Sequence, residues 1–215
     1  ISTATKEKKP ILLDDQVRGH LSCSPDGKRL AFIRAGKRFQ VFAADADGRN
    51  VRQITADDSV NAFYPTWSPD GKQIAFYKSG GARNALMLLT LEGGALTEVV
   101  GGARGSSDHY IFWEPSWSPD GKHIVWAAPG PTSKPWSLPG SDRAPELWLA
   151  KLPNGKPEPF RVNLGAPETI SSFSPSWSPD GTKMLFSAET QVYQLLLMEN
   201  FLPKAGEPQK SQGRF

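Results

Sequence analysis

Trp67-Ser68-Pro69-Asp70-Gly71 is the stretch that decides the fold, because the chain repeats it. The same five residues return at Trp117–Gly121 and Trp177–Gly181, and Cys23–Gly27 is a first copy with cysteine in place of tryptophan. The serines of successive copies are separated by 44, 50 and 60 residues. The shortest separation is near the period of one four-stranded propeller blade. The repeat therefore predicts an array of similar structural units, with insertions in the later ones.

Proline and glycine explain why each copy is a turn. Pro69 presets the backbone for the second position of a type I turn, and Gly71 takes the left-handed position that ends a tight hairpin. The turn aspartates are predicted to bond to local backbone N–H groups, which makes them structural. They are Asp26, Asp70, Asp120 and Asp180. A shared metal or catalytic role is the weaker interpretation, because the four should lie on separate units.

Short apolar stretches flank every turn. Leu30–Ile33 and Ile74–Tyr77 are apolar on both faces, which is typical of a strand buried between two layers. A third strand follows each time and a fourth follows three times, with turn signals such as Asp47-Gly48 between them. The sequence thus predicts an all-β fold: a β-propeller with four recognisable four-stranded blades. These blades form either a closed four-bladed propeller or an arc of a larger one.

The predicted propeller spans residues 9–202, after an N-terminal extension (1–8) and before a C-terminal tail (203–215). The blades are placed around residues 19–55, 63–100, 113–163 and 173–202. Residues 9–14 resemble a displaced fourth strand, which either closes the last blade or finishes a blade upstream. Two stretches break the regularity: Pro129–Pro145, a loop inserted in the third blade, and Gly101–Tyr110, which is expected to lengthen a link between blades.

Composition and the absence of certain motifs argue against several classes of function. The net charge is +3 and basic residues alternate with acidic ones, so a nucleic-acid surface is not indicated. No run of 18 apolar residues exists, so no membrane span is predicted. Cys23 is the one cysteine, which leaves no Cys/His zinc spacing. The Gly-x-Ser-x-Gly pattern of a hydrolase nucleophile is absent. No catalytic residue, metal ligand or cofactor is predicted, and whether the chain is an enzyme stays open.

The candidate binding residues lie just before the turns and in the loops. Aligned on the turn, His20, Tyr64, Glu114 and Ser174 hold one place in the four repeats, which should approach a mouth of the central channel. Simple strand capping and channel lining is the alternative. The other candidates are Phe63, His109, Tyr110, Trp113 and Trp136. By contrast, the repeat tryptophans Trp67, Trp117 and Trp177 are interpreted as wedges packed between blades.

Copies of Trp-Ser-Pro-Asp-Gly-Lys before a buried strand, best matched by Tyr64–Phe76, resemble the TolB-type, WD-repeat-like β-propeller family. The resemblance covers roughly residues 10 to 200. It implies the propeller fold and, on its own, a periplasmic or secreted location. Similar repeats occur in bacterial envelope proteins and in the propeller domains of prolyl-oligopeptidase-type and tricorn-type peptidases. TolB itself has a separate N-terminal α/β domain that is absent here, and TolB-type propellers usually have six blades.

These observations favour a non-catalytic protein-binding or scaffolding module, which is a subunit or domain of a larger envelope assembly. Its partner is then another protein or subunit. The alternative is a propeller that gates or positions substrate for a peptidase or another catalytic subunit. A metal or small-ligand site in the channel is a third possibility.

Overall fold

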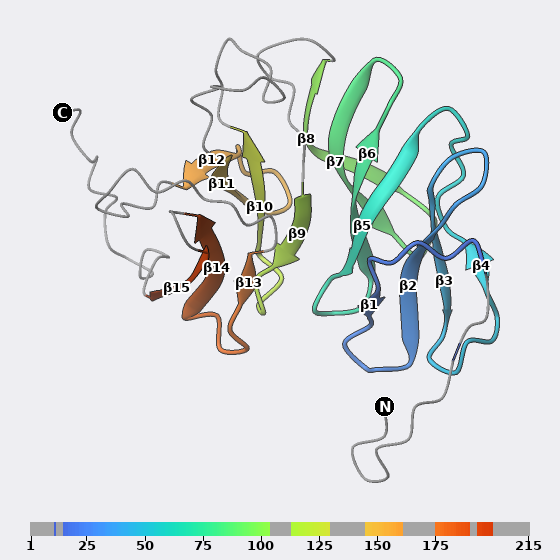
Figure 1. The fold of residues 1–215 in the computed structure, drawn as a ribbon, viewed down its shortest axis with the longest axis horizontal. Helices are drawn as coiled ribbons and strands as arrows, with labels where there is room; N and C mark the ends of the chain where they lie inside the picture. Colours follow the sequence, from blue (N-terminus) through green and yellow to red (C-terminus); the bar gives the residue numbers. More distant parts are fainter. Residues whose placement is uncertain are drawn as a thin grey trace, which may run out of the picture.

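A computed structural model of the 215-residue chain describes residues 11, 15–103, 113–129, 145–160, 175–189 and 193–199. All regular structure in these ranges is β-strand, arranged in four antiparallel sheets that follow the sequence order (Figure 1). None of the described residues belongs to a helix long and apolar enough to span a membrane. The all-β prediction is confirmed.

Each sheet is a meander in which sequence neighbours pair. The first sheet holds β1 (Ser22–Cys23), β2 (Arg29–Arg34), β3 (Gln40–Asp45) and β4 (Arg52–Gln53). The second holds β5 (Asn61–Trp67), β6 (Gln73–Ser79), β7 (Arg83–Thr90) and β8 (Leu96–Ala103). The third holds β9 (Trp113–Trp117), β10 (His123–Pro129), β11 (Pro145–Lys151) and β12 (Glu158–Phe160). The described part of the fourth holds β13 (Ser176–Trp177), β14 (Lys183–Glu189) and β15 (Tyr193–Glu199).

Two sequence expectations concern the edges of these sheets. β8 runs to Ala103, and its Gly101 pairs with Ala85, so the start of the expected link is in fact strand. The predicted closing strand, residues 9–14, lies outside the described residues except for Ile11, an exposed bend. The candidate loop residues His109, Tyr110 and Trp136 also lie outside the described ranges.

The core lies between successive sheets. Ala31 and Val41 of the first sheet share one buried cluster with Trp67 and Ile74 of the second. The next cluster joins the second and third sheets in the same way, around Trp117. Strands of the second sheet that are apolar on both faces are explained by this arrangement, because this sheet meets the first sheet on one side and the third on the other. The extensive strand contacts in the described part join only sheets adjacent in sequence and do not close a ring.

The Ser-Pro-Asp-Gly turns are held by a repeated set of hydrogen bonds. In the second copy, the hydroxyl of Ser68 donates to a carboxylate oxygen of Asp70 at 2.6 Å and accepts from the backbone N–H of Gln73 at 2.9 Å. The same Asp70 oxygen accepts from the backbone N–H of Lys72 at 3.0 Å. Gly71 has φ 68°, in the left-handed region, and its N–H bonds to the Ser68 carbonyl. Equivalent bonds form in the other three copies.

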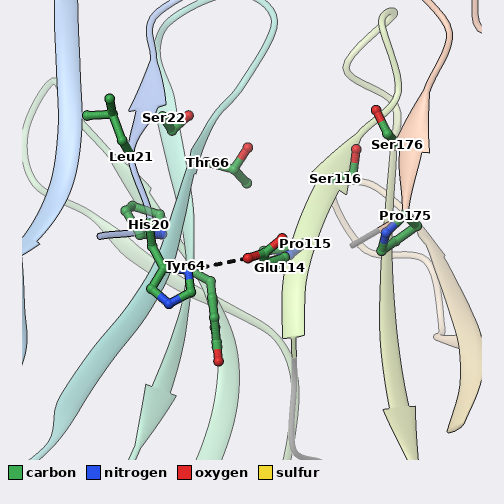
Figure 2. Close-up of a pocket in the computed structure, with 11 residues that line it drawn as sticks. His20, Leu21, Ser22, Tyr64, Thr66, Glu114, Pro115, Ser116, Pro175 and Ser176 are labelled. Carbon is green, nitrogen blue, oxygen red and sulfur yellow. Dashed lines mark ion pairs between the residues drawn. The ribbon is translucent and has the colours of Figure 1, made fainter. Parts of the chain in front are cut away.

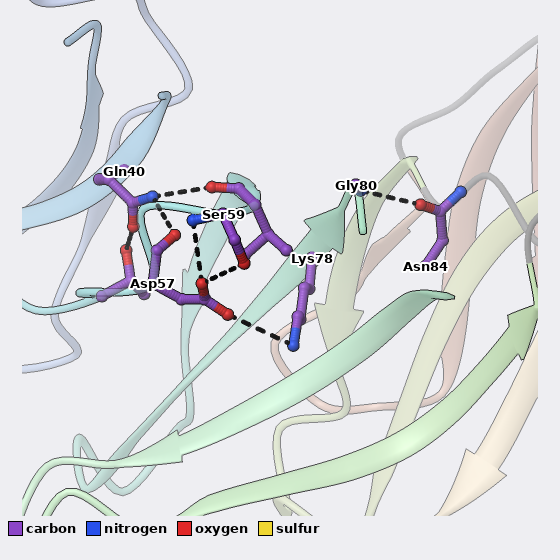
Figure 3. A network of polar contacts seen from close by, with 8 residues as sticks. Gln40, Asp57, Ser59, Lys78, Gly80 and Asn84 are labelled. Carbon is purple, nitrogen blue, oxygen red and sulfur yellow. Dashed lines mark hydrogen bonds and ion pairs between the residues drawn. The ribbon is translucent and has the colours of Figure 1, made fainter. Parts of the chain in front are cut away.

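A partly buried polar network fixes the connection from the first sheet to the second (Figure 3). The Gln40 side chain, 4% exposed, donates to the carbonyls of Asp57 and Val60 at 3.0 and 2.9 Å. Its oxygen accepts from the Thr55 hydroxyl at 2.6 Å. Asp57 in turn accepts from Ser59 and pairs with Lys78 at 3.7 Å. Since buried polar groups must be satisfied, the bonds of Gln40 hold the link in one arrangement, which places the start of β5 beside β3.

Candidate functional site

A pocket of about 320 Å³ lies where the inner strands of all four sheets meet (Figure 2). Its described lining falls into three tiers, each made of residues at the same distance before the turn serine. The first tier is His20, Tyr64 and Glu114. The second is Leu21, Pro65, Pro115 and Pro175, and the third is Ser22, Thr66, Ser116 and Ser176. The repeat therefore determines which positions of each sheet face the pocket.

At Tyr64 and Glu114, the first tier is produced by bulges in the inner strands. Phe63 pairs with Tyr77 and Thr66 with Ala75, so β5 carries one residue more than β6 between these pairs. The same excess occurs in β9, between Trp113 and Ser116. Such a bulge bends the strand and re-aims a side chain.

The backbone is strained at this tier. His20, Tyr64 and Glu114 have φ values of 50°, 55° and 29°. Positive φ is uncommon for residues other than glycine, and each instance costs about 1–3 kcal/mol that the surrounding structure must offset. Strain at one repeat position in three successive sheets marks that position as the candidate site.

The three first-tier side chains interact with one another. Nδ1 of His20 lies 3.3 Å from Oε1 of Glu114, and Figure 2 shows this pair bridging the first and third sheets. The ring of Tyr64 packs edge-on against His20, with 4.4 Å between ring centroids. Burial, and then the nearby Glu114 charge, raise the pKa of the Tyr64 hydroxyl, so it stays protonated at neutral pH. The tier thus combines one carboxylate, one imidazole and one neutral phenol.

The third tier is a set of hydroxyls that sequence reasoning missed. Ser22, Thr66, Ser116 and Ser176 come from the four inner strands in turn. The Ser22 oxygen accepts a hydrogen bond from the backbone N–H of Trp67 at 3.3 Å, which joins the first two sheets at the pocket wall. A signal was present in the sequence, because the position two residues before the turn serine is Ser or Thr in every copy.

The other predicted binding residues have different surroundings. Phe63 is outside the pocket lining, since it packs between Phe39 and Tyr77 with centroid distances of 5.2 and 6.3 Å. Trp113 begins β9, and its side chain lies outside the described part of the chain. Ser174, the expected fourth member of the first tier, also lies outside the described residues, whereas the adjacent Pro175 lines the pocket.

The residues interpreted as structural lie between sheets or in turns. Trp67 and Trp117 are 5% and 8% exposed, and Trp177 is half-buried. The Ser68 hydroxyl, followed by the Lys72 N–H, holds the pKa of Asp70 below its ordinary value. The carboxylates of Asp26, Asp120 and Asp180 likewise accept bonds within their own turns. In the described ranges, no group of three His, Cys, Asp or Glu side chains is placed to hold a metal ion.

Two further side chains lie beside the turns of the third and first sheets. Burial lowers the pKa of His123, whose half-buried side chain lies beside the turn of the third sheet. Cys23, which replaces the repeat tryptophan, is exposed. Its face of the first sheet has no described sheet before it, so a bulky wedge has no partner there.

Comparison with solved structures shows the fold. TolB from Acinetobacter baumannii superposes with a TM-score of 0.68 at 21% identity, over 93% of this chain and 45% of that one. A putative TolB from Agrobacterium tumefaciens gives 0.62 at 18% identity, over 86% of this chain and 62% of that one. A prolyl endopeptidase gives 0.55 at 16% identity, over 89% and 28%.

This chain therefore spans about half of the first TolB structure and less than two thirds of the second. No curated protein matches it significantly in sequence. The sequence profile of the TolB beta propeller domain family, however, matches residues 27–201, which is most of the chain and contains the last three turns in full. The chain belongs to the TolB β-propeller domain family.

Proposed function

We propose that this chain is a non-catalytic binding module whose inner-strand pocket receives a segment of another protein. The observation that carries the proposal is the first tier: three non-glycine residues held at positive φ, one from each of three sheets, around one pocket. Backbone strain of this kind persists only where the rest of the structure over-determines it, and it clusters at ligand sites. The pocket belongs to no single sheet, so it exists only when the sheets are assembled.

The chemistry of the lining favours binding over catalysis. Polar groups converge from four inner strands, and a rigid β scaffold holds them. The described lining offers no nucleophile activated by a neighbouring base: His20 points its Nδ1 at Glu114, and Ser22 accepts a bond from a backbone N–H. Polar and aromatic groups in a preformed concavity are suited to recognition of an inserted side chain or loop.

In this proposal the chain is a domain or subunit of a larger assembly in the bacterial cell envelope. The location rests on family resemblance alone. The TolB structures to which it is similar are longer than this chain.

The alternative is a propeller that positions substrate for a peptidase. It is favoured by the likeness to a prolyl endopeptidase, of which this chain covers only 28%. In that case the companion of this domain is catalytic, and the same pocket faces the catalytic domain.

Site-specific photocross-linking tests the proposal in cells of the source organism. A benzophenone amino acid replaces Tyr64, which lines the pocket, and a matched variant carries it at Leu96, which is 59% exposed at the start of β8. A cross-linked product of defined mass should form at Tyr64 and be absent at Leu96. Mass spectrometry of that product distinguishes a non-catalytic partner from a peptidase. Equal labelling at both positions, or none at Tyr64, contradicts a pocket that receives a protein segment.

A further inference from the structure

We infer that the pocket selects a primary ammonium group, with Glu114 as its counter-ion and the hydroxyl tier as its additional acceptors. The inference rests on the proposed function and names what the inserted segment presents: a lysine side chain or a free N-terminus. An ammonium carries three donors and no acceptor, so it needs several oxygens arranged around one point.

The charge of the lining favours a cation. Glu114 brings a carboxylate, and no lysine or arginine occurs among the described residues of the lining. Four hydroxyl-bearing residues, Ser22, Thr66, Ser116 and Ser176, supply neutral acceptors from the four sheets. The only side chain there that can become positive is His20, and it is already directed at Glu114. A carboxylate ligand would therefore be disfavoured: His20 already contacts Glu114, and the Glu114 carboxylate would repel the ligand.

The His20–Glu114 pair is easily replaced. The two side chains are 36% and 42% exposed, and the atoms are 3.3 Å apart. An ion pair this exposed contributes little to stability because water solvates both partners well. An incoming ammonium exchanges one partner of Glu114 for another, and it brings donors for the hydroxyl tier that His20 does not satisfy.

Tyr64 adds an aromatic wall. Its ring lies edge-on to His20 at 4.4 Å between centroids, so a group that takes the place of the imidazole lies beside the phenol ring. The pocket, about 320 Å³, is at the small end of ligand sites and suits one side chain or chain end rather than a large ligand.

The test uses small probes and the histidine side-chain NMR signals of the whole chain. There are three histidines, and a His20→Asn variant assigns the signal of His20. Nα-acetyl-lysine methylamide presents a side-chain ammonium, and alaninamide presents an N-terminal one. Nα-acetyl-norleucine methylamide lacks the charge, and Nα-acetyl-glutamate reverses it. All are titrated at fixed salt, because exposed charges are screened.

We expect a saturable shift of the His20 signal with at least one ammonium probe, none with norleucine, and none at His123. The stronger of the two ammonium probes identifies the source. Glu114→Gln should weaken the binding of that probe roughly tenfold or more, since a charge-assisted contact is lost. Glu98→Gln is the matched control, because it removes the same charge from β8, where Glu98 pairs with Arg83 at 2.9 Å.

The His20→Asn variant supplies a second, independent test. It removes the competitor for Glu114, so calorimetry should give ammonium binding at least as tight as in the parent chain. Equal shifts with norleucine, preference for glutamate, unchanged affinity in Glu114→Gln, or no saturable shift would each overturn the inference. A cross-link at Tyr64 without probe binding would support the protein-binding proposal and overturn only the ammonium inference. Probe binding without a cross-link would support ammonium recognition and contradict the binding of a protein segment.

Discussion

The indole nitrogen of Trp117 donates a hydrogen bond to the main-chain oxygen of Thr66, 3.3 Å away. Trp177 repeats this relationship with the oxygen of Ser116, also at 3.3 Å. Thr66 and Ser116 both line the inner-strand pocket. Each of these tryptophans therefore does two things: it fills the space between sheets, and it braces the strand of the preceding sheet that forms the pocket wall.

The junction between the first two sheets differs. The indole nitrogen of Trp67 is buried without a hydrogen-bond partner. In compensation, the guanidinium of Arg29 lies over the Trp67 ring, 4.5 Å from its centroid, and donates to the carbonyl of Gly71 at 3.2 Å. The other sheets hold Gln73, His123 and Lys183 where the first holds Arg29. This cation–π contact joins the two sheets by different means.

Replacing Trp117 tests the wedge. Trp117→Ala should lower the free energy of unfolding by about 3–5 kcal/mol, because the side chain is almost fully buried and its loss leaves a cavity. Trp177→Ala should cost less, since Trp177 is only half-buried. Urea denaturation monitored by far-ultraviolet circular dichroism measures both. A loss below about 1 kcal/mol for Trp117→Ala would show that the packing between sheets does not depend on this residue.

Asp180 makes stability depend on pH. The Ser178 hydroxyl, followed by the Thr182 N–H, lowers the pKa of its carboxyl from 3.8 to about 2. A lowered pKa in the folded state means that the contribution to stability is complete above the unfolded pKa of about 3.9 and is lost as the pH falls toward 2. The difference in urea midpoint between the parent chain and Asp180→Asn should therefore shrink between about pH 5 and pH 2.

The carboxyl ¹³C chemical shift of Asp180, followed against pH, measures the pKa of this group in the folded protein directly. A titration midpoint well below the ordinary value of 3.8 is expected. In Ser178→Ala the midpoint should move upward, because the first of the stabilising donors is gone. A midpoint at or above 3.8 in the parent chain would contradict the turn geometry.

Gly121 tests the backbone of the turn. Its φ is 69°, and a methyl group added there would meet its nearest atom, Cδ of Pro69, at 3.9 Å, which is ordinary contact. Gly121→Ala should thus cost about 1–2 kcal/mol, from the left-handed conformation alone. Gly36→Ala is the control, since Gly36 is not in the left-handed region and has room for a methyl group. Equal effects in the two variants would exclude the conformational explanation.

Leu185 tests whether the face of the fourth sheet is open. It holds the place of Ala31, Ala75 and Val125, which are fully buried, yet it is 41% exposed. Val125→Ala should cost roughly 1–3 kcal/mol, and Leu185→Ala less than about 1 kcal/mol, in urea denaturation. If Leu185→Ala instead costs as much as Val125→Ala, this face is covered in solution.

The fold was largely predictable because its signals are local. The Ser-Pro-Asp-Gly turn depends on four consecutive residues, and the buried strands depend on short apolar stretches. Prediction was poorer for an outer strand: β8 runs to Ala103, into the stretch expected to link two blades. An outer strand's length depends on how far its partner extends, as when Arg83 of β7 pairs with Ala103, and such pairing is not a property of either segment alone.

The site divides in the same way. Sequence alone determined that His20, Tyr64 and Glu114 occupy equivalent places. Each lies four residues before the serine of its turn, and residues at the same separation from a repeated turn occupy the same place in each repeat. Only the tertiary structure decided that their backbones adopt positive φ, that His20 reaches Glu114 of the third sheet, and that Phe63 packs against Phe39 and Tyr77 instead. Those outcomes depend on the register between strands and on the spacing between sheets. Both are determined by contacts between residues distant in sequence, such as the hydrogen bond from Gln40 to Val60 and the packing of Trp117 against the second sheet.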